Sequence, residues 1–272
     1  MKSCTAATLA STSGSLTYFA TVSPSVKRFL PNIWRSIAAR VKKGGWKALI
    51  RISKRLRDAV RAALVALGPN PPTRLLFCDA TTGLHDEVIY TDASIKALGI
   101  ILPSLGEVMT FPHSGETLAK YFINRRISIP GLEGLAIVVA ALIRAASLDR
   151  PRRIKIFTDS EVFLKARAKG YSTADLLHES IMLLIDIEYE YGLEITCEFI
   201  PTHINPADLP TKTYPPLNTV TDTPSLYLKV GGRKSAWTAS CQPLPTWVST
   251  WIYSRSNHAN PRAELASIPG AE

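Results

Sequence analysis

The sequence predicts an α/β protein: helices flank a mixed five-stranded sheet, and a basic helical segment precedes it. Two observations predict this fold class. After residue 72 the spacing of apolar residues changes from the helical period of 3.6 to the strand period of two. The excess of positive charge is also confined to the start of the chain. Residues 1–75 hold 14 Lys and Arg and one acid (net +13), whereas residues 76–272 hold 18 and 21 (net −3).

The composition excludes several classes. The chain has 272 residues, a net charge of +10 and 46% hydrophobic residues, which is enough for a sizeable core and too apolar for general disorder. The four cysteines include no Cys-x-x-Cys pair, which argues against a cysteine-built zinc site and fits a reducing compartment. The longest apolar run, Leu135 to Ile143, is half a bilayer span, so no membrane helix is expected. An organelle transit peptide is the alternative for the acid-free N-terminus.

The basic segment is expected to contain two helices, over residues 25–41 and 46–67, with Pro31 at a first turn or a break. The second helix would bury Leu49, Ile50, Leu56, Val60, Ala63, Leu64 and Leu67. Its other face would carry Lys47, Arg51, Lys54, Arg55, Arg57 and Arg61. Such a face is either simply solvated or binds a polyanion, and the near-absence of acid favours the polyanion. Residues 68–72 are expected to form a linker.

The following elements are predicted in the order β-β-β-α-β-α-α-β. The strands are 87–94, 97–102, 107–111, 153–160 and 194–201, and the helices are 132–146, 161–168 and a long one capped by residues 173–175 and ended by Gly192. Short turns suggest that the first three strands form an antiparallel meander. The region after Tyr214, rich in Pro and Trp, is expected to be irregular.

Four acids fall at boundaries of these elements: Asp92, Glu133, Asp159 and Asp208. If the first and fourth strands are adjacent and parallel, Asp92 and Asp159 emerge side by side, and Glu133 can lie over them. Converging carboxylates with no Lys or Arg among them repel unless cations are present, and Mg²⁺ or Mn²⁺ fits that need. Two such ions support phosphodiester hydrolysis. Taken singly, each acid has an ordinary alternative: a helix first turn for Glu133, a helix cap for Asp159 and a turn for Asp208.

Four segments carry a family resemblance. They are Tyr90-Thr91-Asp92-Ala93-Ser94, Pro130-Gly131-Leu132-Glu133-Gly134-Leu135-Ala136, Phe157-Thr158-Asp159-Ser160 and Asn205-Pro206-Ala207-Asp208-Leu209-Pro210-Thr211-Lys212. Together they resemble the ribonuclease H domain of retroelement polyproteins. The resemblance implies a ribonuclease H-like fold over residues 73–213. It also implies that the four acids bind two Mg²⁺ or Mn²⁺ ions and cut the RNA strand of an RNA–DNA hybrid during reverse transcription.

The resemblance extends to neighbouring residues. By this resemblance, His203 corresponds to a histidine that assists product release. The alternative is that His203 is an ordinary histidine in a surface loop. Asn205 either contacts a substrate phosphate or 2′-hydroxyl or forms an Asx turn. Substrate binding is assigned to Ser94, Ser160 and Asn205, and to Lys47, Arg51, Lys54 and Arg55 of the basic segment.

The basic segment, residues 1–72, looks like the thumb or connection region that precedes ribonuclease H in retrotransposons of the tyrosine-recombinase type. No Tyr-x-Asp-Asp polymerase signature occurs, so a reverse-transcriptase polymerase subunit is the implied partner. Residues 214–272 would be a separate irregular tail. Two other functions stay open: a non-catalytic nucleic-acid-binding module of a reverse-transcriptase complex, and an integrase-type nucleotidyl transferase.

Overall fold

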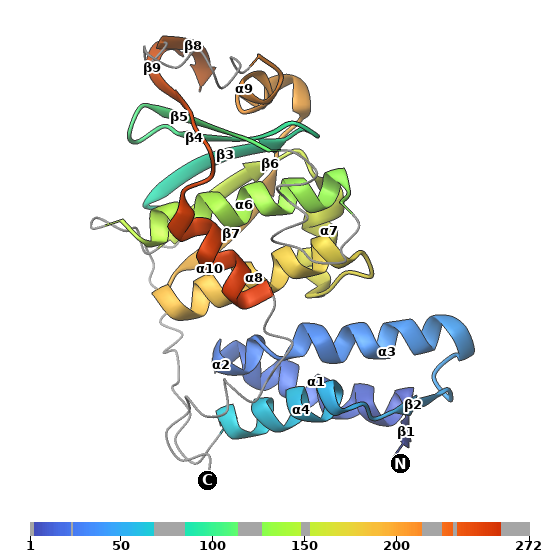
Figure 1. Ribbon diagram of the computed structural model, residues 1–272. Coiled ribbons are helices and arrows are strands. Elements are labelled where there is room, and N and C mark those ends of the chain that lie inside the picture. Colours follow the sequence, from blue (N-terminus) through green and yellow to red (C-terminus); the bar gives the residue numbers. More distant parts are fainter. Residues whose placement is uncertain are drawn as a thin grey trace. The chain divides into compact units, whose positions relative to one another are not determined.

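The computed structural model describes residues 3–22, 24–67, 85–113, 127–147, 153–213, 225–230 and 233–256 (Figure 1). These residues form two compact units. The first consists mainly of the chain before residue 83, and the second consists of residues 83–168 and 174–256. The predicted linker at residues 68–72 lies outside the described residues. No helix of the described part is long and apolar enough to cross a membrane.

The first unit is helical, with one small two-stranded sheet. Its elements are β1 (Ser3–Thr5), α1 (Ala6–Val22), α2 (Pro24–Lys27), α3 (Leu30–Gly44), β2 (Leu49–Arg51) and α4 (Lys54–Leu67). β1 and β2 pair antiparallel. A core of its own includes Leu16, Ile33, Ile37, Ile50 and Leu56.

Helix α1 runs through a Ser- and Thr-rich stretch of low helix propensity. The hydroxyl groups stay inside the helix because they donate to carbonyls four residues earlier: Ser13 to Leu9 at 2.7 Å and Thr17 to Ser13 at 2.8 Å. Ser13 and Leu16 are buried. The hydroxyls are therefore satisfied locally, and the apolar side of the helix can pack.

Two predictions for this unit are corrected. The helix expected over 25–41 is divided before Leu30, and Pro31 lies in the first turn of α3, where its missing amide hydrogen costs nothing. The helix expected over 46–67 is wrong in its first part, since Leu49–Arg51 form β2 and the helix begins at Lys54. Leu49 and Leu64, expected to be buried, are 63% and 54% exposed.

The second unit is an α/β fold with a mixed sheet of seven strands in the order β7-β6-β3-β4-β5-β9-β8. The predicted meander is confirmed as β3 (Glu87–Ala93), β4 (Ala97–Leu102) and β5 (Glu107–Pro112), which pair antiparallel in sequence. β6 (Arg153–Thr158) pairs parallel with both β3 and β7 (Glu194–Phe199). The first and fourth predicted strands are therefore adjacent and parallel.

Helices α6 (Ile129–Ala145), α7 (Glu161–Lys169) and α8 (Asp175–Tyr191) lie on one side of this sheet in Figure 1. The short α9 (Asp208–Thr213) lies on the other side, where Ala207 packs with Ile101 and Val108. Gly192 ends α8, as predicted, and adopts the left-handed conformation. Ala174 occupies the N-cap position of α8 without a side-chain bond, so the expected capping by residues 173–175 is not observed.

The expectation of five strands and an irregular tail is wrong. Ser225–Val230 (β8) and Arg233–Cys241 (β9) form a hairpin, and β9 pairs parallel with β5, which adds two strands to the sheet. Thr246–Ser256 form α10, whose Val248 and Ile252 are buried in the main core. Of the prolines that suggested irregularity, Pro243 and Pro245 lie between β9 and α10, and the others lie outside the described residues.

Candidate functional site

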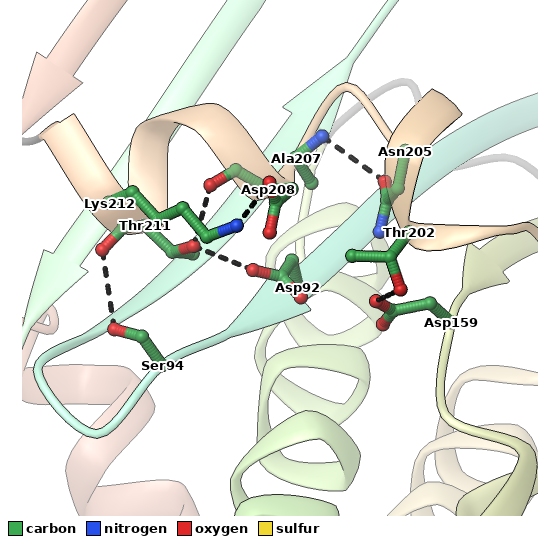
Figure 2. A network of polar contacts seen from close by, with 9 residues as sticks. All are labelled: Asp92, Ser94, Asp159, Thr202, Asn205, Ala207, Asp208, Thr211 and Lys212. Carbon is green, nitrogen blue, oxygen red and sulfur yellow. Dashed lines mark hydrogen bonds and ion pairs between the residues drawn. The ribbon is translucent and has the colours of Figure 1, made fainter.

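The parallel pairing of β3 with β6 brings two of the predicted acids together. The register aligns Tyr90 with Phe157, so Asp92 near the end of β3 and Asp159 directly after β6 emerge at the same edge of the sheet. Figure 2 shows both side chains below the loop that leads into α9, with Asp92 bonded to Thr211 and Asp159 bonded to Thr202. The sequence predicted this juxtaposition from the polar ends of two buried strands, and the strand pairing agrees with it.

Asp208 reaches the same region from the first turn of α9, and a buried asparagine fixes its approach. Asn205 donates from Nδ2 to the Thr91 carbonyl (3.1 Å) and accepts at Oδ1 from the Ala207 amide (3.1 Å). The second bond is the Asx turn that the sequence offered as one alternative. Both ends of the amide are thus bonded to backbone, which pins residues 205–208 to β3.

A glycine lets α9 come close to the sheet. A Cβ at Gly99, the residue paired with Asp92 on β4, would lie 2.7 Å from Thr211 Cγ2 and 2.9 Å from the Ala207 carbonyl oxygen. Only the missing side chain allows this approach. The Ser94 hydroxyl donates to the Thr211 carbonyl (3.3 Å), which ties α9 to the turn after β3.

Each of the three aspartates has one polar donor from this loop and helix (Figure 2). Thr211 Oγ1 donates to Asp92 Oδ2 at 2.6 Å, and Thr202 Oγ1 donates to Asp159 Oδ2 at 2.7 Å. Lys212 Nζ forms an ion pair with Asp208 Oδ2 at 2.7 Å. Sequence reasoning missed these three donors. Only Lys212 had a local signal, its i, i+4 spacing from Asp208 in α9, because the acceptors of Thr202 and Thr211 are far away in sequence.

Glu133 completes the group from α6. It is the fifth residue of that helix, past the first turn, so the helix dipole does not account for its position. The Glu133 carboxylate forms a hydrogen bond with the Ser160 side chain. Ser160 Oγ also accepts from the Phe163 amide (3.2 Å) and so caps α7, a role that sequence reasoning had offered as the alternative for Asp159.

The pKa values of Asp92 and Glu133 are both raised, and burial is the main cause. Burial raises the pKa of Asp92 to about 6, against the lowering effect of the Thr211 hydrogen bond, and repulsion from Asp159 and Asp208 adds to the rise. Burial likewise raises the pKa of Glu133, and Asp159 and Asp92 contribute to that rise. Burial, together with the neighbouring carboxylates, therefore destabilises the charged forms of Asp92 and Glu133.

Two observations bear on whether a cation fits here. Asp159 Oδ1 is buried and has no hydrogen-bond partner among the described residues, so one carboxylate oxygen is left for a further ligand. Against this, no three His, Cys, Asp or Glu side chains of the described chain are arranged as a metal-binding group. Lys212 is also a cation among the acids, and this corrects the expectation that no Lys or Arg lies with them. Carboxylate oxygens are the ligands that a hard cation prefers. In this structure, however, the carboxylates are held by hydrogen bonds and an ion pair with neighbouring side chains.

The remaining predicted residues lie elsewhere. His203 is exposed on a short 3₁₀ turn, Thr202–Ile204, beside the site loop. Lys47, Arg51 and Lys54 are exposed in the first unit, but not on one helix: they lie in a turn, in β2 and at the start of α4. Arg55 follows in α4, and its side chain is outside the described part.

The chain matches no protein-family model, no curated protein and no solved structure. The functional conclusion therefore depends on the residues and geometry of this site.

Proposed function

We propose that the second unit is a divalent-metal-dependent nuclease of the ribonuclease H type, which hydrolyses the RNA strand of RNA–DNA hybrids. The observation that carries the proposal is the convergence of four acids from four separate elements. Asp92 and Asp159 lie at the same end of two paired parallel strands. Asp92 interacts electrostatically with Asp159 and Asp208, and Glu133 interacts with Asp159 and Asp92. A fold gains no stability from such repulsion, so the cluster is better explained by a cationic ligand.

Asp92, Glu133, Asp159 and Asp208 would hold the cations, with Mg²⁺ or Mn²⁺ as the ions that carboxylate oxygens select. When bound, two such ions lower the pKa of an attacking water and stabilise the leaving oxygen of the phosphodiester. The residues around the acids orient them. Thr202 fixes one oxygen of Asp159 and leaves Oδ1 unpartnered, and Thr211 fixes one oxygen of Asp92. Lys212 partly neutralises the cluster through Asp208.

Within this proposal Asn205 positions the site. Its amide atoms are bonded to the backbone of Thr91 and Ala207, and it thereby holds Asp208 against β3. Ser94 acts in the same way on the other side of α9. Substrate contacts by Asn205, Ser94 and Ser160, and assistance by His203, stay predictions.

The experiment is a cleavage assay on an RNA–DNA hybrid, with Mg²⁺ or with EDTA. We expect Mg²⁺-dependent cleavage by the wild-type chain and a loss of about 100-fold or more in Asp159→Asn, since several kcal/mol of charge stabilisation depend on that carboxylate. Asp86→Asn is the matched control. Asp86 precedes β3 at the opposite end of the strand and accepts a hydrogen bond from the Arg153 amide (2.9 Å). Undiminished cleavage by Asp159→Asn, or equal losses in both variants, would reject the site.

A second candidate function is a non-catalytic module that binds hybrid in a reverse-transcriptase complex. The Lys212–Asp208 ion pair and the lack of a ready metal-binding group among the described residues favour it. Hybrid binding that is tight in EDTA and never followed by turnover in Mg²⁺ or Mn²⁺ would support this module over the nuclease.

A further inference from the structure

An exposed tryptophan lies in a basic turn of the first unit. Residues 45–48 form a β-turn, in which the Ala48 amide donates to the Gly45 carbonyl (3.1 Å) and Gly45 adopts a φ of 68°. Trp46 and Lys47 are the two central residues of this turn. Trp46 is 55% exposed, and Leu49 at the start of β2 is 63% exposed. Two large apolar side chains therefore stand in solvent without a role in the core of this unit.

The start of α1 holds the backbone of this turn in place. The Ala6 amide donates to the Ala48 carbonyl (2.9 Å), and the Ala7 amide donates to the Trp46 carbonyl (3.0 Å). Amides in the first turn of a helix have no acceptor within the helix, so these bonds satisfy both partners. Ile50 is buried directly after the turn and anchors it to the core. Trp46 is thus presented by an ordered backbone, which lowers the entropic cost of binding a ligand.

Several Lys and Arg residues lie close to Trp46 in the sequence. Lys42, Lys43, Lys47, Arg51 and Lys54 are all exposed. Arg51 shares the exposed face of β2 with Leu49, because Ile50 between them points inward. None of the five forms an ion pair within the described part of the chain. The one acid of residues 3–67, Asp58, is buried, so no exposed carboxylate of this segment compensates the positive charge.

We infer that the Trp46 turn (residues 42–54) is a binding site for single-stranded nucleic acid. A base stacks on the Trp46 indole, and the surrounding Lys and Arg side chains bind phosphates. An aromatic platform in a positive surface is the combination that binds single strands with little sequence preference. The choice of nucleic acid over an anionic lipid surface rests on the proposed nuclease function. It also agrees with the small apolar area, since membrane-surface helices bury a whole apolar face.

The test measures binding of the full-length chain to a labelled oligothymidylate of about 12 nucleotides by fluorescence anisotropy, in EDTA so that no metal-dependent cleavage can occur. We expect Trp46→Ala to weaken binding about tenfold, which lies within the range for loss of one base stack, and Trp46→Phe to retain most of it. Trp247→Ala is the matched control, because Trp247 is 46% exposed on α10 of the second unit. Lys47→Ala should reduce the slope of log K against log salt by about one.

Unchanged binding by Trp46→Ala, or an equal loss in Trp247→Ala, overturns the inference. So does binding to phosphatidylserine vesicles that exceeds oligonucleotide binding and depends on Trp46. Circular dichroism of Trp46→Ala and Trp46→Phe checks that each variant is folded. If Trp46→Ala is not folded, Trp46→Phe is used to test stacking. The outcome is separable from that of the nuclease. Asp159→Asn should bind the oligonucleotide like the wild type, and Trp46-dependent binding by a chain that never cleaves hybrid would reject the nuclease alone.

Discussion

At the scale of single residues, Asp92 links the stability of the fold to its proposed function. Its side chain is buried near two other carboxylates, and its pKa is raised to about 6. The folded protein therefore holds the Asp92 proton more tightly than the unfolded chain does. Ionisation of Asp92 at neutral pH costs folding free energy, which a bound cation would recover.

This residue supports a prediction on pH. In EDTA, the contribution of Asp92 to folding stability should be largest below about pH 4 and be lost as the pH rises through 6, because the pKa is raised in the folded state. Asp92→Asn should consequently stabilise the protein at pH 7.5, by about 3 kcal/mol at most, and the gain should vanish near pH 4. Urea unfolding at both pH values measures it. A variant less stable than wild type at pH 7.5 would show that the carboxylates do not repel in the fold.

At the scale of elements, the approach of α6 to α7 and α8 depends on glycine. A Cβ at Gly131 would lie 2.7 Å from Leu176 Cγ, and one at Gly134 would lie 2.9 Å from Ser180 Cβ and 3.0 Å from the Phe163 ring. Contacts this short force a neighbour to move. Since Glu133 lies between these two glycines, the close packing also sets where its carboxylate sits relative to β3 and β6.

We predict that Gly134→Ala destabilises the fold by about 1–3 kcal/mol, although alanine is the better helix former. Gly14→Ala is the matched control in α1, because a Cβ there meets no atom within 4 Å. That variant should be more stable than wild type by about 0.5–1 kcal/mol. Chemical denaturation of the two variants measures the difference, and a Gly134→Ala variant as stable as wild type or more stable would show that α6 does not need the glycine.

At the scale of the whole second unit, the C-terminal elements belong to the main fold. Val248 and Ile252 of α10 are buried in the core built on the β3–β7 sheet. Arg255 stacks on Trp251, with its guanidinium carbon 4.1 Å from the ring centroid. It also forms two hydrogen bonds with Glu190 of α8, at 3.0 and 2.6 Å. These contacts hold α10 against α8.

Ile252→Ala should therefore cost about 2–5 kcal/mol of folding stability, the range for emptying a buried aliphatic site. Tyr253→Ala, at the neighbouring and 46% exposed position, should change stability by less than about 1 kcal/mol. Thermal unfolding of both variants provides the comparison. Equal and small effects would mean that α10 is not part of the core.

The sequence by itself determined the elements whose periodicity is strong and local. The three strands of the meander, the apolar helix α6 and the glycine that ends α8 follow from alternation, burial and left-handed backbone preference. The order of these elements, and the polar ends of β3 and β6, were enough to predict that Asp92 and Asp159 meet. The element predictions use residues that are close in sequence. The predicted meeting of Asp92 and Asp159 needs only one long-range pairing, that of β3 with β6.

Tertiary structure alone decided the rest, because it depends on partners far apart in the chain. The apolar residues around β2 have the spacing of a helix, but the segment forms a strand because its backbone pairs with β1, more than forty residues earlier. β9 joins the sheet because β5 offers a free edge, which no local pattern in residues 233–241 announces. The state of the acidic site was decided in the same way. Thr202 and Thr211 become donors to Asp159 and Asp92 only when the loop after β7 and α9 fold back over β3, whereas Lys212 pairs with Asp208 within α9 itself.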